Sequence, residues 1–275
     1  MSRILLAFSV ACAVGAGGAE TKIFFRLGGA DVARLSLRQI RAKVPPVAIA
    51  VHEPHEAKDV TYRGIPTVAL LDAVLGPGWR EREELLFTCA DGYQPSIPVS
   101  EVLARESVLS FERVGEKRFG LVNRLQGGEE VALGPLYLVW NNKKHPELLK
   151  SGATGWPYQV VGVDAYTYLE RFGAMAPPDS AGEEAKRGFQ AFRKHCFTCH
   201  TVNGAGGLKN VELNYPVSVT ELFKEEWLLK WILDPSSIRW KTKMPTLEVE
   251  NKEQVAREIV AYLKVMAGNK KQPKD

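Results

Sequence analysis

Short runs of hydrophobic and β-branched residues, separated by Gly, Pro and Asp, dominate residues 23–172. Runs of this length and composition predict β-strands. The four clearest are residues 47–51, 85–88, 136–140 and 159–163. Two segments, 35–42 and 68–75, instead repeat hydrophobic residues at helical spacing. The pattern therefore predicts an α+β domain of mostly antiparallel strands.

The pattern changes at residues 173–182, where small residues and the pair Pro177-Pro178 favour neither a strand nor a helix. Beyond this linker, hydrophobic residues recur at helical spacing in three segments: 183–194, 219–233 and 253–266. Val255, Ile259, Leu263 and Met266 share one face of the last segment. We therefore expect two domains, an α+β domain at residues 20–172 and an all-α domain at residues 183–275.

Residues 1–19 form a separate segment with one positive charge, Arg3, and a short apolar run that ends in small residues. This is the pattern of a cleaved secretory signal peptide, so we expect a periplasmic or otherwise exported protein. The run is shorter than the about 20 residues that span a bilayer, and no other stretch is long and apolar enough. Cys12 follows Ser9-Val10-Ala11, which leaves a lipid anchor at Cys12 as an alternative.

Composition excludes several classes of protein. The chain has 275 residues, 45% hydrophobic and 25% charged, which is ordinary for a globular protein of about two domains. Cleavage after Ala19 would remove Arg3 and lower the formal net charge from +4 to about +3, too small a bias to indicate a nucleic-acid partner. Three cysteines would remain, and an odd number in an exported protein argues against a disulfide scaffold.

The sequence Cys196-Phe197-Thr198-Cys199-His200 is the attachment signature of c-type haem. The two residues between the cysteines let both sulfur atoms reach the vinyl groups of a porphyrin, and the adjacent imidazole reaches the iron. A redox dithiol and half of a zinc site are the alternatives, but zinc needs further ligands and this domain offers only His195. We expect one covalent haem c on Cys196 and Cys199, with His200 as an axial ligand of the iron.

A second axial ligand is expected from a later loop. Met244 lies between two predicted helices, and its thioether suits low-spin iron and raises the reduction potential relative to a second His. The alternative is a methionine that fills a gap in the core. Met266 lies on the packed face of the last predicted helix and Met175 lies in the linker. We therefore assign Met244 as the second axial ligand.

Residues 182–268 resemble a class I cytochrome c domain. Gly188 and Phe192 stand at the spacing at which the first helix of that family crosses the last, and Tyr262 is the expected partner on the last helix. The string Leu233-Asp234-Pro235, followed by Lys243-Met244-Pro245, resembles the family's approach to its Met ligand.

One departure from this family concerns the residues after the haem motif. The family commonly has a Gly-Pro pair whose carbonyl group orients the proximal His, whereas this chain reads Gly-Gly-Leu-Lys-Asn at residues 206–210. The sequence therefore leaves the hydrogen-bond partner of His200 unassigned.

An iron whose positions are filled by a porphyrin and two protein ligands disfavours substrate chemistry, so we expect electron transfer. Four lysines flank the predicted haem segments and are candidates for a basic docking rim that attracts an acidic partner: Lys194, Lys209, Lys241 and Lys243. A merely solvated lysine surface is the alternative.

Residues 23–168 resemble the molybdopterin-binding domain of the sulfite oxidase family, and segments 61–72, 90–98 and 134–140 carry the resemblance. Active members hold molybdenum through a Cys shortly after an early strand. The comparable stretch, residues 51–56, reads Val-His-Glu-Pro-His-Glu, and Cys89 belongs to another strand. We therefore do not expect molybdopterin.

Two groups of residues in this first domain each allow more than one interpretation. The pair His52 and His55, with Glu53 and Glu56, is either a divalent-metal site or exposed polar surface. Cys89 is expected to be a small buried hydrophobic residue, with an intermolecular disulfide or a reactive thiol as alternatives.

These observations together predict a periplasmic monohaem c-type cytochrome. We expect an electron-transfer protein or redox subunit rather than a self-contained enzyme, with a first domain that docks a redox partner or an enzyme subunit. One alternative is a molybdopterin- or metal-dependent oxidoreductase with a built-in haem electron acceptor. Another is a structural subunit of a respiratory complex.

Overall fold

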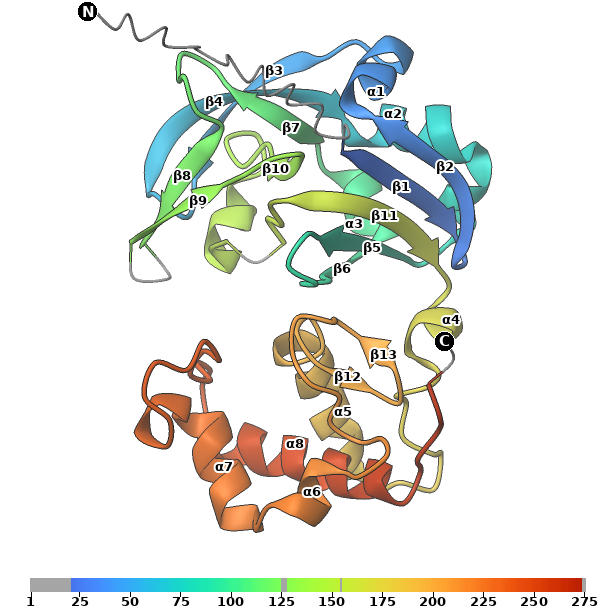
Figure 1. The fold of residues 1–275 in the computed structure, drawn as a ribbon, viewed down its shortest axis with the longest axis vertical. Helices are drawn as coiled ribbons and strands as arrows, with labels where there is room; N and C mark the ends of the chain where they lie inside the picture. The colour runs from blue at the N-terminus through green and yellow to red at the C-terminus, as the bar shows by residue number, and fades with distance from the viewer. Residues whose placement is uncertain (1–20, 125–127, 154, 274–275) are drawn as a thin grey trace, which may run out of the picture.

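The structure, a computed structural model, describes residues 21–124, 128–153 and 155–273. The expected signal segment and Cys12 lie outside the described residues. The described chain forms two halves, and each half has its own hydrophobic core. Figure 1 shows the sheet-rich N-terminal half above the helical C-terminal half. No helix in these ranges is long and apolar enough to cross a membrane.

Two sheets build the N-terminal half (Figure 1). The five-stranded sheet has the order β2 (Ala30–Ser36), β1 (Lys22–Leu27), β11 (Val160–Tyr166), β5 (Glu84–Cys89) and β6 (Ser96–Pro98). The four-stranded sheet has the order β10 (Tyr137–Trp140), β7 (Ser107–Arg113), β4 (Lys58–Pro66) and β3 (Val47–Glu53). A separate hairpin joins β8 (Gly120–Asn123) and β9 (Glu129–Ala132). Only β1 and β11 pair in parallel among these strands, so the predicted mostly antiparallel α+β fold is confirmed.

The predicted elements of this half are present. The four predicted strands are β3, β5, β10 and β11, and the two predicted helices are α1 (Leu37–Lys43) and α2 (Thr67–Leu75). A third helix, α3 (Val99–Ala104), follows β6. Helix α1 starts two residues later than predicted because Ser36 caps it: its hydroxyl accepts from the Gln39 amide while the Gln39 side chain accepts from the Ser36 amide.

Helices dominate the C-terminal half. They are α4 (Tyr168–Phe172), α5 (Glu183–His195), α6 (Val219–Leu222), α7 (Glu225–Leu233) and α8 (Lys252–Ala267). The predicted all-α domain also contains a two-residue ladder of β12 (Thr201–Val202) and β13 (Ala205–Gly206). On α8, the predicted face is confirmed, with Ile259, Leu263 and Met266 buried.

The predicted crossing of the first and last helices is confirmed. A Cβ atom at Gly188 of α5 would lie 1.8 Å from the carbonyl oxygen of Glu258 on α8, so only glycine allows this approach. The rings of Phe192 and Tyr262 lie 5.3 Å apart beside it. This contact fixes the end of α5, and therefore the start of the haem motif, against the core.

The structure differs from the predictions at two places in this half. The single helix predicted at residues 219–233 is broken, because Phe223 and Lys224 are extended and separate α6 from α7. The predicted linker is not a free connection: Phe172 and Met175 are buried in the C-terminal core, and the Met175 carbonyl accepts a 2.7 Å hydrogen bond from Tyr262. The hydrophobic contacts of this core thus begin before residue 173.

Candidate functional site

The haem motif begins at the C-terminal end of helix α5. Cys196 is its C-cap, and the amides of Cys199 and His200 donate to the Cys196 carbonyl at 3.1 and 3.0 Å, so the motif folds as a tight turn. Both motif cysteines are free thiols. Burial raises the pKa of Cys196 to about 12 and raises that of Cys199 as well, which keeps both thiols protonated at neutral pH.

The loop after the motif wraps closely around it. The amides of Gly207 and Asn210 donate to the carbonyls of Phe197 and Cys199 at 2.7 and 2.8 Å. A Cβ atom at Gly207 would lie 1.9 Å from the Thr198 carbonyl oxygen. The glycines that distinguish this chain from the family pattern therefore let the loop approach the motif backbone.

We expect Gly207→Ala to disrupt this loop, because its Cβ would overlap a backbone oxygen that has no rotamer to move. The expected result is a loss of about 2–4 kcal/mol in the free energy of unfolding of the C-terminal half and a lower yield of haem-loaded protein. Chemical denaturation followed by haem absorbance measures both. Gly268→Ala is the matched control, since its Cβ would find its nearest neighbour at 3.6 Å; equal losses in both variants would contradict this account.

The structure supplies the hydrogen-bond partner of His200 that the sequence left unassigned. Nδ1 of His200 lies 2.9 Å from the carbonyl oxygen of Val211. Because a carbonyl only accepts, Nδ1 carries the proton, and Nε2 keeps a free lone pair for iron. Burial lowers the pKa of His200, which favours this neutral form. The side chain of Val211 gives no sequence signal for this hydrogen bond, because the acceptor is the backbone carbonyl oxygen.

Met244 lies on the loop between α7 and α8. Its sulfur accepts a 2.9 Å hydrogen bond from the indole nitrogen of Trp231 on α7, and the side chain is half-buried. Met175 and Met266 are fully buried in the hydrophobic core. The core role predicted for Met266 is therefore confirmed, and Met244 is the methionine of these three whose thioether is not packed in that core.

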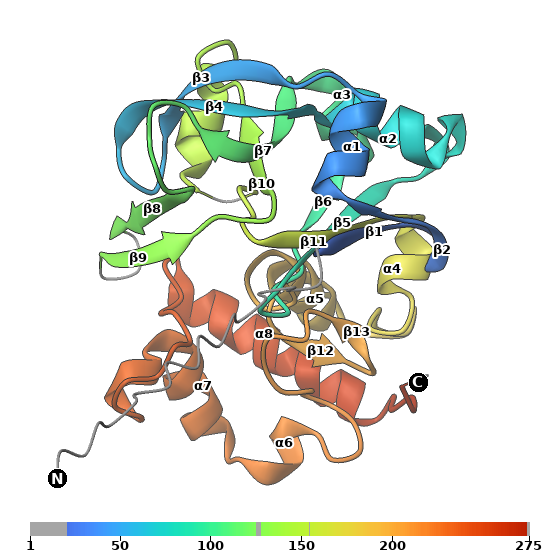
Figure 2. The same ribbon diagram turned by 45° about the horizontal axis from the view of Figure 1, so that its top comes forward.

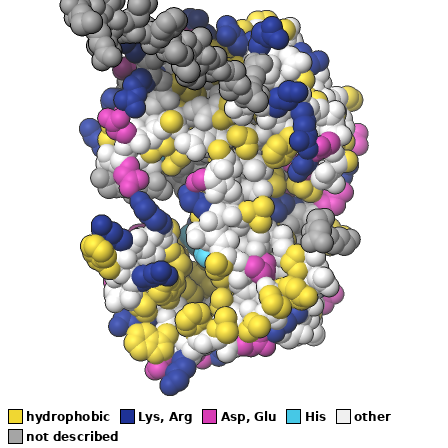
Figure 3. Space-filling model, in the orientation of Figure 1, with side chains coloured by type: hydrophobic (Ala, Val, Ile, Leu, Met, Phe, Trp, Pro, Cys, Tyr) yellow, Lys and Arg dark blue, Asp and Glu magenta, His cyan; other side chains and the backbone are white. Residues whose placement is uncertain are grey.

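The C-terminal half leaves large apolar side chains exposed. The most exposed are Trp240 (82%), Leu169 (76%), Leu208 (70%), Val211 (65%) and Leu222 (64%). Figure 3 shows a hollow in this half, lined by hydrophobic side chains and with a histidine side chain at its wall. An apolar hollow of this kind suits a flat apolar ligand. Together with two free thiols and an imidazole with a free nitrogen, it fits haem c.

The N-terminal half packs directly on the haem motif through the loop between β5 and β6 (Figures 1 and 2). The Gln94 amide donates to the Thr198 carbonyl at 2.9 Å, and the Leu208 amide donates to the Gly92 carbonyl at 2.9 Å. Gly92 has φ +83°, and a Cβ there would lie 2.9 Å from the backbone of Leu208. This close backbone contact holds the first half against the predicted haem segment.

Two of the four lysines considered for a docking rim are paired with this first half. Lys209 lies 2.6 Å from the Asp91 carboxylate, and Lys243 lies 2.9 Å from Glu129. Lys194 and Lys241 are exposed and form no ion pair within the described ranges. The rim prediction is therefore revised, because the acidic groups of this same chain already neutralise half of it.

The candidate metal residues of the first half are divided among separate interactions. Glu53, fully buried, accepts hydrogen bonds from Tyr62, Tyr137 and His55 at 2.7–3.0 Å. Glu56 pairs with Arg113, and His52 pairs with Asp59. Among the described residues, no group of three or more His, Cys, Asp or Glu side chains is arranged for a metal ion. The alternative, that these residues form exposed polar surface, is also wrong, since Glu53, His55 and Glu56 are buried.

The Glu53 network predicts a measurable stability effect. We expect Glu53→Gln to lower the free energy of unfolding of the N-terminal half by about 2–3 kcal/mol, because the amide group turns one acceptor into a donor facing hydroxyl and imidazole donors. Thermal unfolding followed by circular dichroism measures it. Glu130→Gln, at a 72% exposed side chain, is the control. A loss no larger than that of the control would show that the network contributes little.

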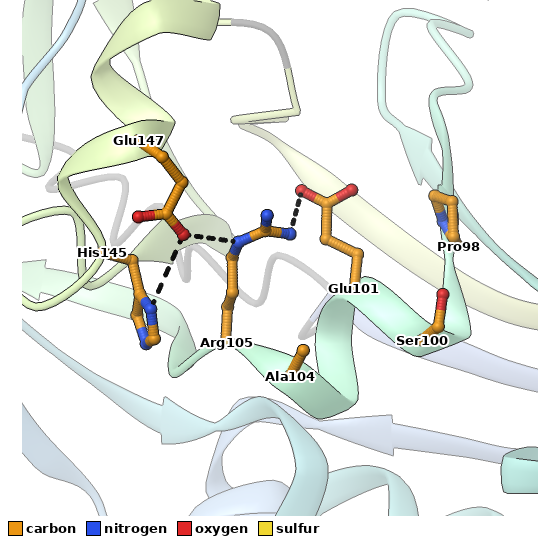
Figure 4. A pocket seen from close by; sticks show the side chains of 7 residues that line it. All are labelled: Pro98, Ser100, Glu101, Ala104, Arg105, His145 and Glu147. Carbon is orange, nitrogen blue, oxygen red and sulfur yellow. Dashed lines mark hydrogen bonds and ion pairs between the residues drawn. The ribbon is translucent and has the colours of Figure 1, made fainter.

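Cys89 and a surface hollow are two further features of the N-terminal half. Cys89 on β5 is 4% exposed, as predicted for a small buried residue, and burial raises its pKa. The hollow, of about 390 Å³, lies beside α3 (Figure 4). Its charged groups pair with one another: Arg105 contacts Glu147 at 3.1 Å and Glu101 at 3.2 Å, so they are not aimed at a ligand.

Comparison with known protein families agrees with the geometry of the C-terminal half. Residues 185–267 match the family model described as cytochrome c, a stretch that includes the haem motif and Met244. No curated protein matches the chain. The match does not extend to the N-terminal half, so the resemblance of that half to the sulfite oxidase family has no support from it. Residues 185–267 are therefore similar to the cytochrome c family, whose members bind haem c covalently and transfer electrons.

Proposed function

We propose that this chain is an exported monohaem cytochrome c that exchanges single electrons with a redox partner. The haem would be attached through Cys196 and Cys199, and His200 and Met244 would be the protein ligands of its iron. The observation that carries the proposal is the Nδ1 contact of His200 with Val211, because it presents a neutral imidazole beside two free thiols.

The bound haem would supply a one-electron iron couple. The protein would keep it in place through the crossing of α5 and α8, which fixes the motif, and through the loop at residues 206–210, which holds the motif backbone. The apolar hollow would exclude water from the iron, and the Val211 carbonyl would keep the His200 ring oriented. With both axial positions filled by protein, the domain would carry electrons without binding a substrate at the iron.

The N-terminal half is proposed to dock a redox partner or an enzyme subunit. Its packing on the haem motif supports this role, because a partner bound to the first half would be held at a fixed position relative to the haem. The segment at residues 1–19 supports export.

A potentiometric titration tests the proposed function. Protein matured in a periplasm that contains haem-attachment machinery should show one reversible couple with a slope of one electron. Absence of any such couple in haem-loaded protein would contradict electron transfer. A second couple that belongs to a molybdenum centre would instead favour the oxidoreductase alternative.

A further inference from the structure

The loop that carries Met244 also exposes a tryptophan between two cations. Trp240 is 82% exposed, more than any other large hydrophobic side chain in the described ranges. The ammonium group of Lys241 lies 4.4 Å from the centre of its ring, a cation–π contact that holds the two side chains together. Arg239, which precedes Trp240 in the sequence, is also exposed.

These cations differ from the other basic groups near the haem motif. Arg239 and Lys241 form no ion pair with any carboxylate in the part of the chain that the structure describes, whereas Lys209 and Lys243 are paired with Asp91 and Glu129. Figure 3 shows basic and hydrophobic side chains gathered on the same lobe, beside the apolar hollow. Because Arg239 and Lys241 are exposed and unpaired, their positive charges are available to an external partner.

The other approach to the haem motif is already occupied. The loop between β5 and β6 covers the motif at Thr198 through backbone hydrogen bonds, and the Asp91–Lys209 pair closes its edge. A protein that is to come close to the haem cannot use that face without displacing the N-terminal half. On the Met244 loop, Lys243 pairs with Glu129 of the N-terminal half, whereas Arg239, Trp240 and Lys241 are exposed.

We propose that Arg239, Trp240 and Lys241, here called the Trp240 surface, dock a redox protein whose contact face carries carboxylates around an apolar centre. Trp and Arg are the side chains that most often dominate binding energy at protein interfaces, and the unpaired cations select an acidic partner. The inference rests on the proposed function, since Met244, four residues after Trp240, is a proposed iron ligand.

Electron-transfer kinetics with an acidic probe protein test this proposal. The probe is a reduced plant-type [2Fe–2S] ferredoxin, whose low reduction potential makes transfer to a His/Met haem favourable. Stopped-flow absorbance gives the second-order rate constant for haem reduction at low and high ionic strength. The variants are Trp240→Ala and the double variant Arg239→Glu/Lys241→Glu, each first shown to have the haem spectrum and potential of the unmodified protein.

The matched control is Arg38→Glu/Arg257→Glu, which makes the same change in net charge at two exposed arginines on α1 and α8. At low ionic strength we expect the Arg239/Lys241 variant to react about tenfold more slowly, the control to change less than about twofold, and the difference to fade at high ionic strength. We expect Trp240→Ala to react about three- to tenfold more slowly at both ionic strengths.

Equal rates for the Arg239/Lys241 variant and its control would overturn the proposal. So would unchanged ferredoxin rates combined with binding of the unmodified protein, but not of Trp240→Ala, to phosphatidylglycerol vesicles, because the surface would then serve an anionic membrane. These outcomes leave the proposed function intact, since it depends on the haem and its couple. A chain with no haem or no one-electron couple would overturn both.

Discussion

Replacing Cys196 and Cys199 together by alanine is expected to leave no haem on the chain after denaturation. In the unmodified protein, Cys196 and Cys199 would each supply the sulfur of one thioether bond to a haem vinyl group, an addition of S–H that needs no external oxidant. The double variant lacks both nucleophiles, so any haem it retains is held only by axial ligation and apolar contact. Intact mass spectrometry in denaturing solvent should show the unmodified protein heavier by one haem and the variant with no added mass.

The control for this prediction is Cys89→Ala. Cys89 is buried in the N-terminal core and lies on a different element, so its loss should leave the added haem mass unchanged. A shift of one haem mass that survives loss of both motif cysteines would contradict the attachment at Cys196 and Cys199.

Met244→Ala is expected to change the iron ligation without detaching the haem. The ferric protein should lose the weak band at the near-infrared edge that Met-ligated haem shows. Its reduction potential should fall by on the order of 0.1 V, a fraction of the about 0.8 V that axial ligands span. Visible spectra and a potentiometric titration measure the two effects, and intact mass should still include one haem.

Met266→Leu is the control for the second ligand. Met266 is fully buried on α8, so leucine should cost some stability and keep the band. The assignment of Met244 would be wrong if its alanine variant kept the band while the Met266 variant lost it.

The parts of the site that follow from local sequence were predictable. The haem motif is a contiguous string, and the resemblance to class I cytochromes c implies the helix crossing at Gly188. The face of α8 was visible because a 3.6-residue period places Ile259, Leu263 and Met266 on one side.

The parts that depend on backbone atoms or distant segments were not predictable. The Val211 carbonyl that orients His200 carries no side-chain signature. The contacts of Gln94 with Thr198 and of Gly92 with Leu208 join segments about 100 residues apart, and no local pattern encodes them. The break at Phe223 was missed because hydrophobic periodicity continues across it while the backbone becomes extended.

The metal and haem content of the purified chain, read together with its oxidised and reduced visible spectra, tests the central claim most directly. The account predicts one iron and one covalent haem per chain, no stoichiometric molybdenum, and the near-infrared-edge band of a Met-ligated ferric haem. One molybdenum per chain would contradict the proposal that the N-terminal half is a docking domain and would make the protein an enzyme with its own electron outlet. A chain matured with haem-attachment machinery that contains no iron would contradict the proposed function as a whole.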